Sequence, residues 1–267
     1  MDAVTFSSPQ PGIALITLNR PASLNAIDGA LLDGLDAALD AVSSDSTYRV
    51  AVLTGAGRGF SAGADRSGRG APWTPKASSQ WKQMYDAQVR LTDQMTRLYE
   101  LPIPTIAAVH GAAVGGGLAF ALHCDLRIAA ADARFGCAFI TAGFSSMDMG
   151  TSYLLPKIVG AGHARDLMLS GRHVLADEAY RMGLVTSVVP SDELLDRAIE
   201  RAQSLAANNA YGLWQTKIGL NAALDAPSLR HAKELENRTQ IIAGFTGNPE
   251  EAGVAFLERR PPVWKPL

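Results

Sequence analysis

The sequence predicts an α/β protein in which short buried strands alternate with helices. Short apolar runs such as 50–54 end in glycine or proline and are too brief for helices. Longer stretches between them repeat apolar residues every three or four positions, which is the helical period. Strand, glycine turn and helix follow one another repeatedly through the first half, without sequence identity between the units. This order indicates a stacked β/α layout with largely buried strands.

The first half of the chain supplies three strands and two helices by these criteria. In the stretch 30–42, apolar residues that include Leu31, Leu35 and Leu39 share one helical face. The segment 66–79 is rich in glycine, proline, serine and charge, so we expect a mobile surface loop there, with Trp73 in need of an apolar partner. The predicted strands cover 12–18, 50–54 and 105–109, and the predicted helices cover 30–42 and 81–99.

Helices dominate from residue 151 onward. A short helix over 175–183 is closed by its C-terminal glycine, and a last strand over 185–189 ends at Pro190. No flexible linker precedes the remaining helices, so we expect them to pack on the main body as a small subdomain. These helices are predicted near 192–208, 211–224, 228–243 and 249–259.

Composition excludes several classes of protein. Of the 267 residues 47% are hydrophobic and 19% charged, which fits a globular protein with a substantial core. No apolar run approaches the roughly 18 residues of a membrane span, and the N-terminus lacks a signal-peptide pattern. A formal charge of −2 gives no reason to expect nucleic acid. Cys124 and Cys137 are expected to be free thiols in a cytoplasmic protein, and no His/Cys spacing suggests a metal site.

The stretch GFSAG, residues 59–63, has the spacing of the nucleophile elbow of serine hydrolases. An elbow must follow a strand and open a helix, and the strand over 50–54 is present. The residues after Gly63 are too rich in glycine and proline for a helix, so the required context is missing. A hydrolase that uses Ser61 is therefore a minor alternative, and the glycines need another explanation.

Three consecutive glycines, 115–117, follow the strand over 105–109 and precede a helix-forming stretch. The first N–H groups of a helix have no internal partner, and glycine lets a ligand oxygen approach them closely. The glycines could instead serve only close packing of helix and strand. The sharper hypothesis pairs this turn with residues 61–65, so that two backbone N–H groups meet on one carbonyl oxygen as it becomes an enolate.

Five ordered motifs resemble the crotonase (enoyl-CoA hydratase/isomerase) superfamily. They are ITLNRPASLNAI, VLTGAGRGFSAGAD, PIPTIAAVHGAAVGGGLAFALHCDLRIAAADARFG, LLPKIVG and ADEAYRMGLVTSVVP. The resemblance runs from about residue 12 to 190 and continues more weakly to the C-terminus. It implies a spiral of ββα units over 1–195, followed by a helical trimerisation region over 196–267. It also implies a homotrimer or dimer of trimers that binds acyl-CoA thioesters, with no cofactor because coenzyme A is part of the substrate.

The resemblance also assigns candidate site residues. The thioester oxygen would lie between the backbone N–H groups of Ala62 and Gly116, which form an oxyanion hole. The segment made of Ala62, Gly63, Ala64 and Asp65 would border the adenine end of coenzyme A. Lys265 matches a basic residue near the family's C-terminus that can contact coenzyme A, its own or that of a neighbouring subunit, and a disordered tail is the alternative.

The chain departs from the hydratases of this family at both of their glutamate positions. Those positions are Ala119 and Phe139 here, and neither side chain can transfer a proton. A different carboxylate, Asp148, lies in a stretch that resembles the family's double-bond isomerases. Asp148 could instead cap the helix that follows it, because aspartate is a favoured N-cap residue.

Together with these residues, the resemblance implies an acyl-CoA-binding enzyme that is an enoyl-CoA double-bond isomerase, with Ala62 and Gly116 as oxyanion donors and Asp148 as the proton carrier. One alternative is a catalytically silent acyl-CoA carrier or sensor that retains the oxyanion hole. Another is an enoyl-CoA hydratase by family label only.

Overall fold

The large sheet forms the centre of the molecule. The computed structural model describes residues 2–67, 70 and 79–266. In this part of the chain, β1 pairs antiparallel with β2 and the other neighbours pair in parallel. Its order is β1 (Val4–Gln10), β2 (Ile13–Leu18), β3 (Val50–Gly55), β4 (Thr105–Val109), β6 (Leu126–Ala130) and β9 (Ser187–Val189). Strands β3 and β4 are buried along their whole length, as is usual for parallel strands covered on both faces.

A second, smaller sheet lies beside the glycine triplet. It contains β5 (Ala112–Val114), β7 (Arg134–Gly136) and β8 (His173–Leu175). Strand β7 pairs in parallel with β5 and antiparallel with β8. Strand β5 leads into α3 (Gly116–His123), so its pairing with β7 fixes one side of the turn between them.

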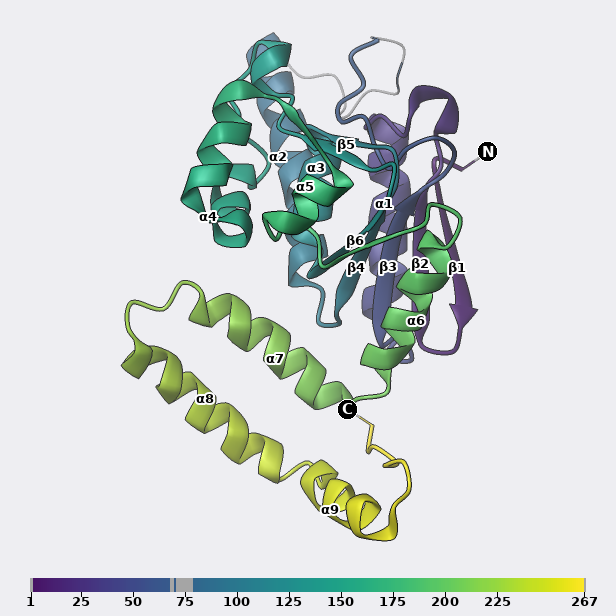
Figure 1. The fold of residues 1–267 in the computed structure, drawn as a ribbon, viewed down its shortest axis with the longest axis vertical. Coiled ribbons are helices and arrows are strands. Elements are labelled where there is room, and N and C mark those ends of the chain that lie inside the picture. The colour runs from purple at the N-terminus through teal and green to yellow at the C-terminus, as the bar shows by residue number, and fades with distance from the viewer. Residues whose placement is uncertain (1, 68–69, 71–78, 267) are drawn as a thin grey trace.

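Helices cover both faces of the large sheet (Figure 1). The apolar sides of α1 (Gly29–Ser44), α2 (Gln80–Glu100) and α3 join one core with inward residues such as Ile16 and Leu53. The opposite face of the sheet is covered by α6 (Leu194–Ala206), whose Leu194 packs with residues such as Val52. The remaining helices of the main body are α4 (Thr151–Ser170) and α5 (Ala176–Arg181).

Three C-terminal helices extend away from this body: α7 (Ala210–Ala223), α8 (Leu229–Gly244) and α9 (Asn248–Glu258) (Figure 1). The side chain of Lys217 in α7 is only 4% exposed and lies 2.9 Å from the carboxylate of Asp125. Beyond the end of α7, Asp225 contacts Tyr153 and Lys157 of α4. These polar contacts fix α7 against the main body.

The α/β class is confirmed, and the long predicted helices match observed ones. The predicted boundary between residues 195 and 196 is corrected, because it falls inside α6, whose buried residues pack on the large sheet. The helical extension therefore begins at Ala210. The sequence reasoning also missed β1, an edge strand whose residues are mostly exposed. Most of the predicted loop over 66–79, Trp73 included, lies outside the described residues.

Candidate functional site

The segment 61–65 passes between the turn at 24–27 on one side and β5 on the other. The Ile27 N–H donates to the Gly63 carbonyl at 2.8 Å, and the Asp65 N–H donates to the Ile27 carbonyl at 2.9 Å. On the other side, the Ser61 N–H donates to the Ala112 carbonyl at 2.8 Å. Backbone hydrogen bonds on both sides therefore hold the segment at a fixed distance from the glycine triplet.

The prediction for Ala62 does not hold. Its N–H donates to the Leu24 carbonyl at 2.9 Å, so this group is already engaged within the chain. Gly63 then has a φ of 81°, in the left-handed region that favours glycine, and the chain changes direction there. Within the described residues no hydrogen bond engages the next N–H, that of Ala64. Ala64 therefore replaces Ala62 as the candidate donor on this segment.

Gly116 lies directly against this segment. A Cβ atom built on Gly63 would be 3.1 Å from the nitrogen of Gly116, and one built on Gly116 would be 3.6 Å from the Cα of Gly63. Gly116 is the first residue of α3, so its N–H precedes the hydrogen-bonded turns of the helix. The described residues supply no acceptor for it. Ala64 and Gly116 thus present two unengaged N–H groups on adjoining chain segments.

Ser61 is not placed as a nucleophile. Its side chain is fully buried, and its Oγ donates to the Asn25 carbonyl at 2.9 Å. The same oxygen accepts the N–H of Gly63 at 3.2 Å. Ser61 therefore stabilises the turn around Gly63 rather than pointing into a site.

The carboxylate of Asp65 is committed to contacts inside the protein. Its Oδ1 accepts hydrogen bonds from the hydroxyl and N–H of Ser67, and its Oδ2 lies 3.0 Å from the Arg20 guanidinium. These bonds to Ser67, followed by those to Arg20, hold the pKa of Asp65 below its ordinary value. Arg20 also pairs with Asp28, the N-cap of α1. The side chain of Asp65 therefore anchors the end of the segment that contains Ala64.

Asp148 lies in the loop before α4 and is half-buried. Its Oδ1 accepts hydrogen bonds from the Met149 N–H at 2.7 Å and from the side-chain amide of Gln88 in α2. The N-cap of α4 is Gly150, and no side chain caps this helix. The capping explanation for Asp148 is therefore wrong, and its carboxylate is left to another role.

Met149 connects Asp148 with the glycine triplet. Its φ is 47°, which is uncommon for a residue with a side chain, and Gly150 follows with a φ of 68°. The Asp148 carbonyl accepts the Thr151 N–H at 2.8 Å, so the four residues form a turn with two left-handed centres. The Met149 sulfur lies 3.3 Å from a Cβ built on Gly116. The strained turn thus brings the loop of Asp148 to the start of α3.

The two positions where the hydratases of the family have glutamates are apolar and enclosed. Ala119 is fully buried and Phe139 is 7% exposed. The Phe139 ring comes within 4.0 Å of a Cβ built on Gly115. Nearby, His123 is buried with its Nδ1 2.8 Å from the Ala119 carbonyl, and this burial lowers its pKa. The side chains at these two positions therefore offer no group that could orient a water molecule.

Lys265 is not brought to this site within its own chain. Its N–H donates to Asn248 at 2.9 Å, and its side chain lies beside Gly247, at the start of α9 and far from α3 (Figure 1). Trp264 donates to the Ala207 carbonyl at 2.6 Å, so this end of the chain is fastened rather than disordered. The prediction of Lys265 as a substrate contact is corrected for a single chain.

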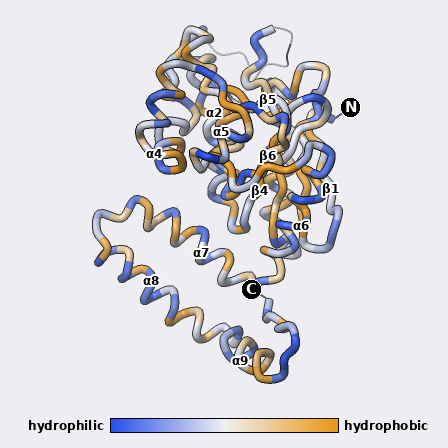
Figure 2. Tube along the Cα trace, in the orientation of Figure 1, coloured by the Kyte–Doolittle hydropathy of each residue, from blue (hydrophilic) through white to orange (hydrophobic). Residues whose placement is uncertain are grey.

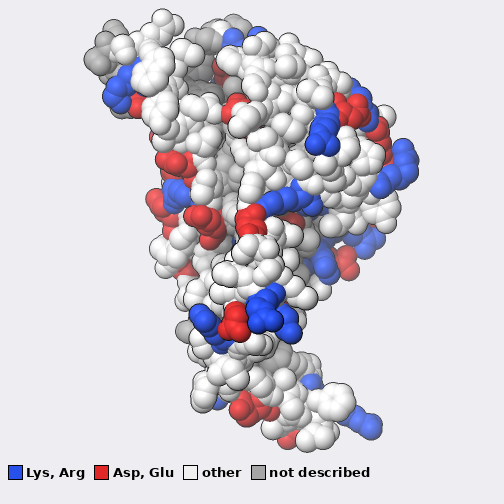
Figure 3. All heavy atoms as spheres, turned by 90° about the vertical axis from the view of Figure 1, so that its left-hand side faces the viewer, with Lys and Arg blue, Asp and Glu red and all other residues white. Residues whose placement is uncertain are grey.

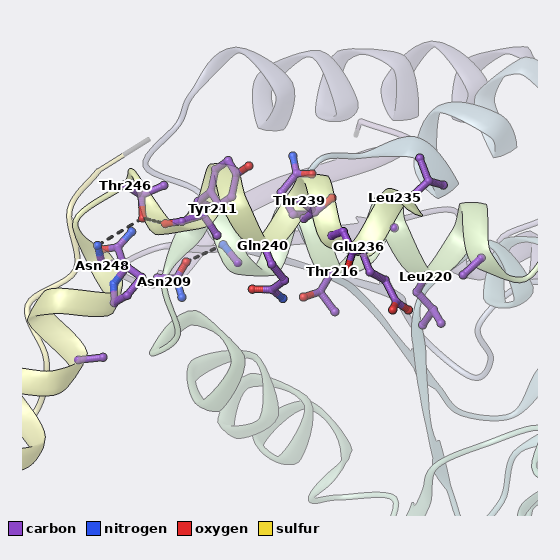
Figure 4. A pocket seen from close by; sticks show the side chains of 18 of the residues that line it. Asn209, Tyr211, Thr216, Leu220, Leu235, Glu236, Thr239, Gln240, Thr246 and Asn248 are labelled. Atoms are coloured by element: carbon purple, nitrogen blue, oxygen red, sulfur yellow. Dashed lines mark hydrogen bonds between the residues drawn. The ribbon is translucent and has the colours of Figure 1, made fainter. Parts of the chain in front are cut away.

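A groove of about 710 Å³ lies in the C-terminal extension rather than at the glycine turns. Figure 4 shows Thr216 and Leu220 of α7 beside Glu236 and Gln240 of α8 along it. Its other lining residues include Tyr211, Asn248 and Trp264. The groove therefore belongs to the extension and is separate from the site around Gly116.

Charge gives no further site. On the face shown in Figure 3, basic and acidic side chains are interspersed among broad uncharged areas. In the part of the chain that the structure describes, no three His, Cys, Asp or Glu side chains gather to hold a metal ion. Among the described helices, none combines the length and apolar character needed to cross a membrane.

Sequence reasoning missed Gln88 and Met149. Gln88 lies on a predicted helix with no motif around it, and only the fold brings it to Asp148, which is 60 positions away in the chain. Met149 follows Asp148 directly, but its left-handed backbone has no sequence signal, because glycine or asparagine is the usual residue in that conformation.

The two sheets and the helical extension have the architecture of one class of enzymes, which the comparisons with known proteins identify. The model of the enoyl-CoA hydratase/isomerase family matches residues 8–266. The chain therefore belongs to the enoyl-CoA hydratase/isomerase (crotonase) family.

Its relatives have different names. A probable enoyl-CoA hydratase of Mycobacterium tuberculosis is 41% identical over 98% of this chain and 92% of its own length. A 1,2-epoxyphenylacetyl-CoA isomerase of Escherichia coli is 36% identical over 96% of both chains. The crystal structure of a probable enoyl-CoA hydratase/isomerase from Mycobacterium abscessus has a TM-score of 0.91 and 38% identity, and covers 97% of both chains. Membership of the family is thus shown, and its relatives include proteins named as hydratases and one named as an isomerase.

Proposed function

We propose that this enzyme is an enoyl-CoA double-bond isomerase whose proton carrier is Asp148. One observation carries the proposal: a half-buried carboxylate lies beside Met149, which contacts the start of α3, while Ala119 and Phe139 are apolar. Isomerisation needs one group that removes a proton from one carbon and returns it to another. Hydration also needs an oriented water molecule, and the apolar side chains of Ala119 and Phe139 offer no hydrogen-bonding group to orient one.

The N–H groups of Ala64 and Gly116 are proposed to bind the thioester oxygen. Both lack a described acceptor, and the segments that carry them are in contact. Preorganised backbone donors stabilise the charge that develops on such an oxygen in the transition state. Asp148 takes the proton, the electron pair moves onto the thioester oxygen as an enolate, and the proton returns at the other carbon. The reaction so written needs no separate cofactor, because coenzyme A is part of the substrate.

The test uses the purified protein with a 3-enoyl-CoA. The appearance of the conjugated 2-enoyl thioester is followed by ultraviolet absorbance, and 3-hydroxyacyl-CoA is measured by chromatography. We expect isomerisation with negligible hydration. Asp148→Asn should lose roughly two to four orders of magnitude in rate, as expected for general acid–base catalysis, while acyl-CoA affinity changes little. Rapid hydration would indicate a hydratase, and binding without turnover by the parent would indicate a carrier. Undiminished isomerisation by Asp148→Asn would remove Asp148 from the mechanism.

A homotrimer or a dimer of trimers is proposed to form through α7, α8 and α9. These helices expose large apolar side chains that a lone extension leaves in water, including Leu229, Ile241, Phe245, Phe256 and Leu257 (Figure 2 shows the apolar stretches). Lys265 would then be placed to contact the coenzyme A of a neighbour. Light scattering at micromolar concentration tests the assembly, and a monomer would contradict it.

A reducing compartment, the cytoplasm, is proposed from the two cysteines. Cys124 and Cys137 are free and buried. Burial raises the pKa of Cys124 to about 12 and that of Cys137 to about 11, so both remain thiols at neutral pH. The fold thus uses them as small apolar side chains and requires no oxidised pair.

A further inference from the structure

The two oxygens of the Asp148 carboxylate have different surroundings. Oδ1 accepts two hydrogen bonds, from the Met149 N–H and from the Nε2 of Gln88. Among the described residues no group donates to Oδ2. One oxygen is therefore held by the protein, and the other has no partner among the described residues.

The two donors come from separate parts of the fold. Met149 belongs to the strained turn after Asp148, whereas Gln88 reaches the carboxylate of Asp148 from the middle of α2. The backbone donor fixes Oδ1 only relative to its own loop. The amide of Gln88 fixes it relative to α2, a helix whose C-terminal half joins the main core through Leu91, Met95 and Leu98. Both donors together restrict the rotation of the carboxylate.

Gln88 is exposed, so its amide contributes little to the apolar core. Ordering a glutamine side chain reduces its conformational entropy, and a single exposed hydrogen bond offsets little more than this cost. Stability alone is therefore a weak reason for the contact. Orientation of Asp148 is a stronger one.

We propose that Gln88 is a positioning residue that holds Oδ1 of Asp148, so that Oδ2 takes the substrate proton and returns it. The inference rests on the proposed function, in which Asp148 is the proton carrier. Oδ2 forms the O–H bond as the C–H bond breaks, and that electron pair moves onto the thioester oxygen. The O–H bond breaks again when the proton returns to the second carbon, so Asp148 ends as it began. A misplacement of about 1 Å in such a step can cost 10²-fold in rate.

The experiment compares Gln88→Met, which keeps the length and removes the donor, with Gln80→Met, the same change at an exposed position at the start of α2. We expect Gln88→Met to lower kcat for isomerisation by roughly 10- to 100-fold with KM changed less than about threefold. Gln80→Met should behave as the parent. Gln88→Glu, which has the same shape and no amide donor, should lower kcat at least as much as Gln88→Met. Melting temperatures of all variants check that they fold.

A double-mutant cycle shows whether Gln88 acts through Asp148. In the Asp148→Asn background, Gln88→Met should change the residual rate by less than about twofold, because the group that it positions is gone. An equal loss in both backgrounds would overturn the inference, as would full activity of Gln88→Met beside a slow Asp148→Asn. In that last case the proposed function still stands. If Asp148→Asn itself is as fast as the parent, the proposed function fails, and this inference fails with it.

Discussion

Gly117 is the point at which α3 approaches the segment 61–65 most closely, and an alanine there tests that approach. A Cβ built on Gly117 would lie 2.9 Å from both the carbonyl carbon and the Cβ of Ser61, and closer still to the carbonyl oxygen. Real Cβ contacts are not this short. Most of these atoms are backbone, so they cannot move aside as the end of a flexible side chain can. Gly117→Ala must therefore push α3 and the segment apart.

The expected loss of stability follows from this overpacking. Forcing an extra methyl group into a well-packed core costs about 1–3 kcal/mol of unfolding free energy. For a chain of this size that corresponds to a fall in Tm of roughly 2–10 °C. The same displacement separates Gly116 from Gly63 and hence from Ala64. If it misaligns one proposed oxyanion donor, kcat should fall by about 10²–10³-fold.

Thermal unfolding and isomerase kinetics measure the two effects in parallel. The matched control is Gly162→Ala in α4, where a built Cβ meets nothing within 4 Å and the residue is exposed. Alanine there should leave activity unchanged and stabilise the helix by about 0.5–1 kcal/mol. The reasoning would be refuted if Gly117→Ala had the same Tm as the control and the same kcat as the parent.

Three further changes follow from single contacts. Lys217→Met leaves Asp125 without its buried partner. Removing one member of a fully buried ion pair lowers the free energy of unfolding by about 3–5 kcal/mol. Because Asp125 is a quarter exposed and keeps its bonds to Thr105, we expect a smaller loss of about 2 kcal/mol, measured by urea unfolding. Lys233→Met, at an exposed position, is the control, and equal urea midpoints for the two variants would contradict the prediction. His123 has a pKa lowered by burial, so stability should be full above about pH 6.5 and decline as the pH falls below it. His123→Gln should flatten that decline, and an unchanged slope would exclude His123 as its source. Ser61→Ala should retain isomerase activity, and a fluorophosphonate probe should leave Ser61 unlabelled, because its hydroxyl is buried and engaged with Asn25.

The long elements of the fold were predictable because their apolar spacing is unambiguous. The helix over 30–42 and the buried strand over 50–54 correspond to α1 and β3 with ends shifted by at most two residues. Strand β1 was missed because most of its residues are exposed and it contains a proline, so no buried pattern marks it. Strands β5, β7 and β8 have three residues each, too few for any period to be detected.

In the segment 61–65 the sequence located the candidate donor to within two residues, whereas it gave no sign of the contact between Gln88 and Asp148. The motif around Gly63 located the segment, but only the backbone reveals that the left-handed turn engages Ala62 and leaves Ala64 unengaged. Asp148 was found through its resemblance to isomerases, whereas its contact with Gln88 depends on how α2 packs. The sequence could not show that Lys265 lies beside Gly247 at the start of α9, because a position in the sequence says nothing about where an extension projects.

The contacts at Lys217 and Asp225 bear on how copies of this chain would meet. Because α7 is tied to the main body at its middle and just beyond its end, the extension has a defined orientation before any encounter. Association through it would then be the docking of preformed surfaces, with little backbone rearrangement. Its rate would be set by diffusion and orientation, as for rigid partners, rather than by the ordering of a flexible arm. We therefore expect each association step to be second order, with a speed that depends on protein concentration and hardly on the folding rate of the extension.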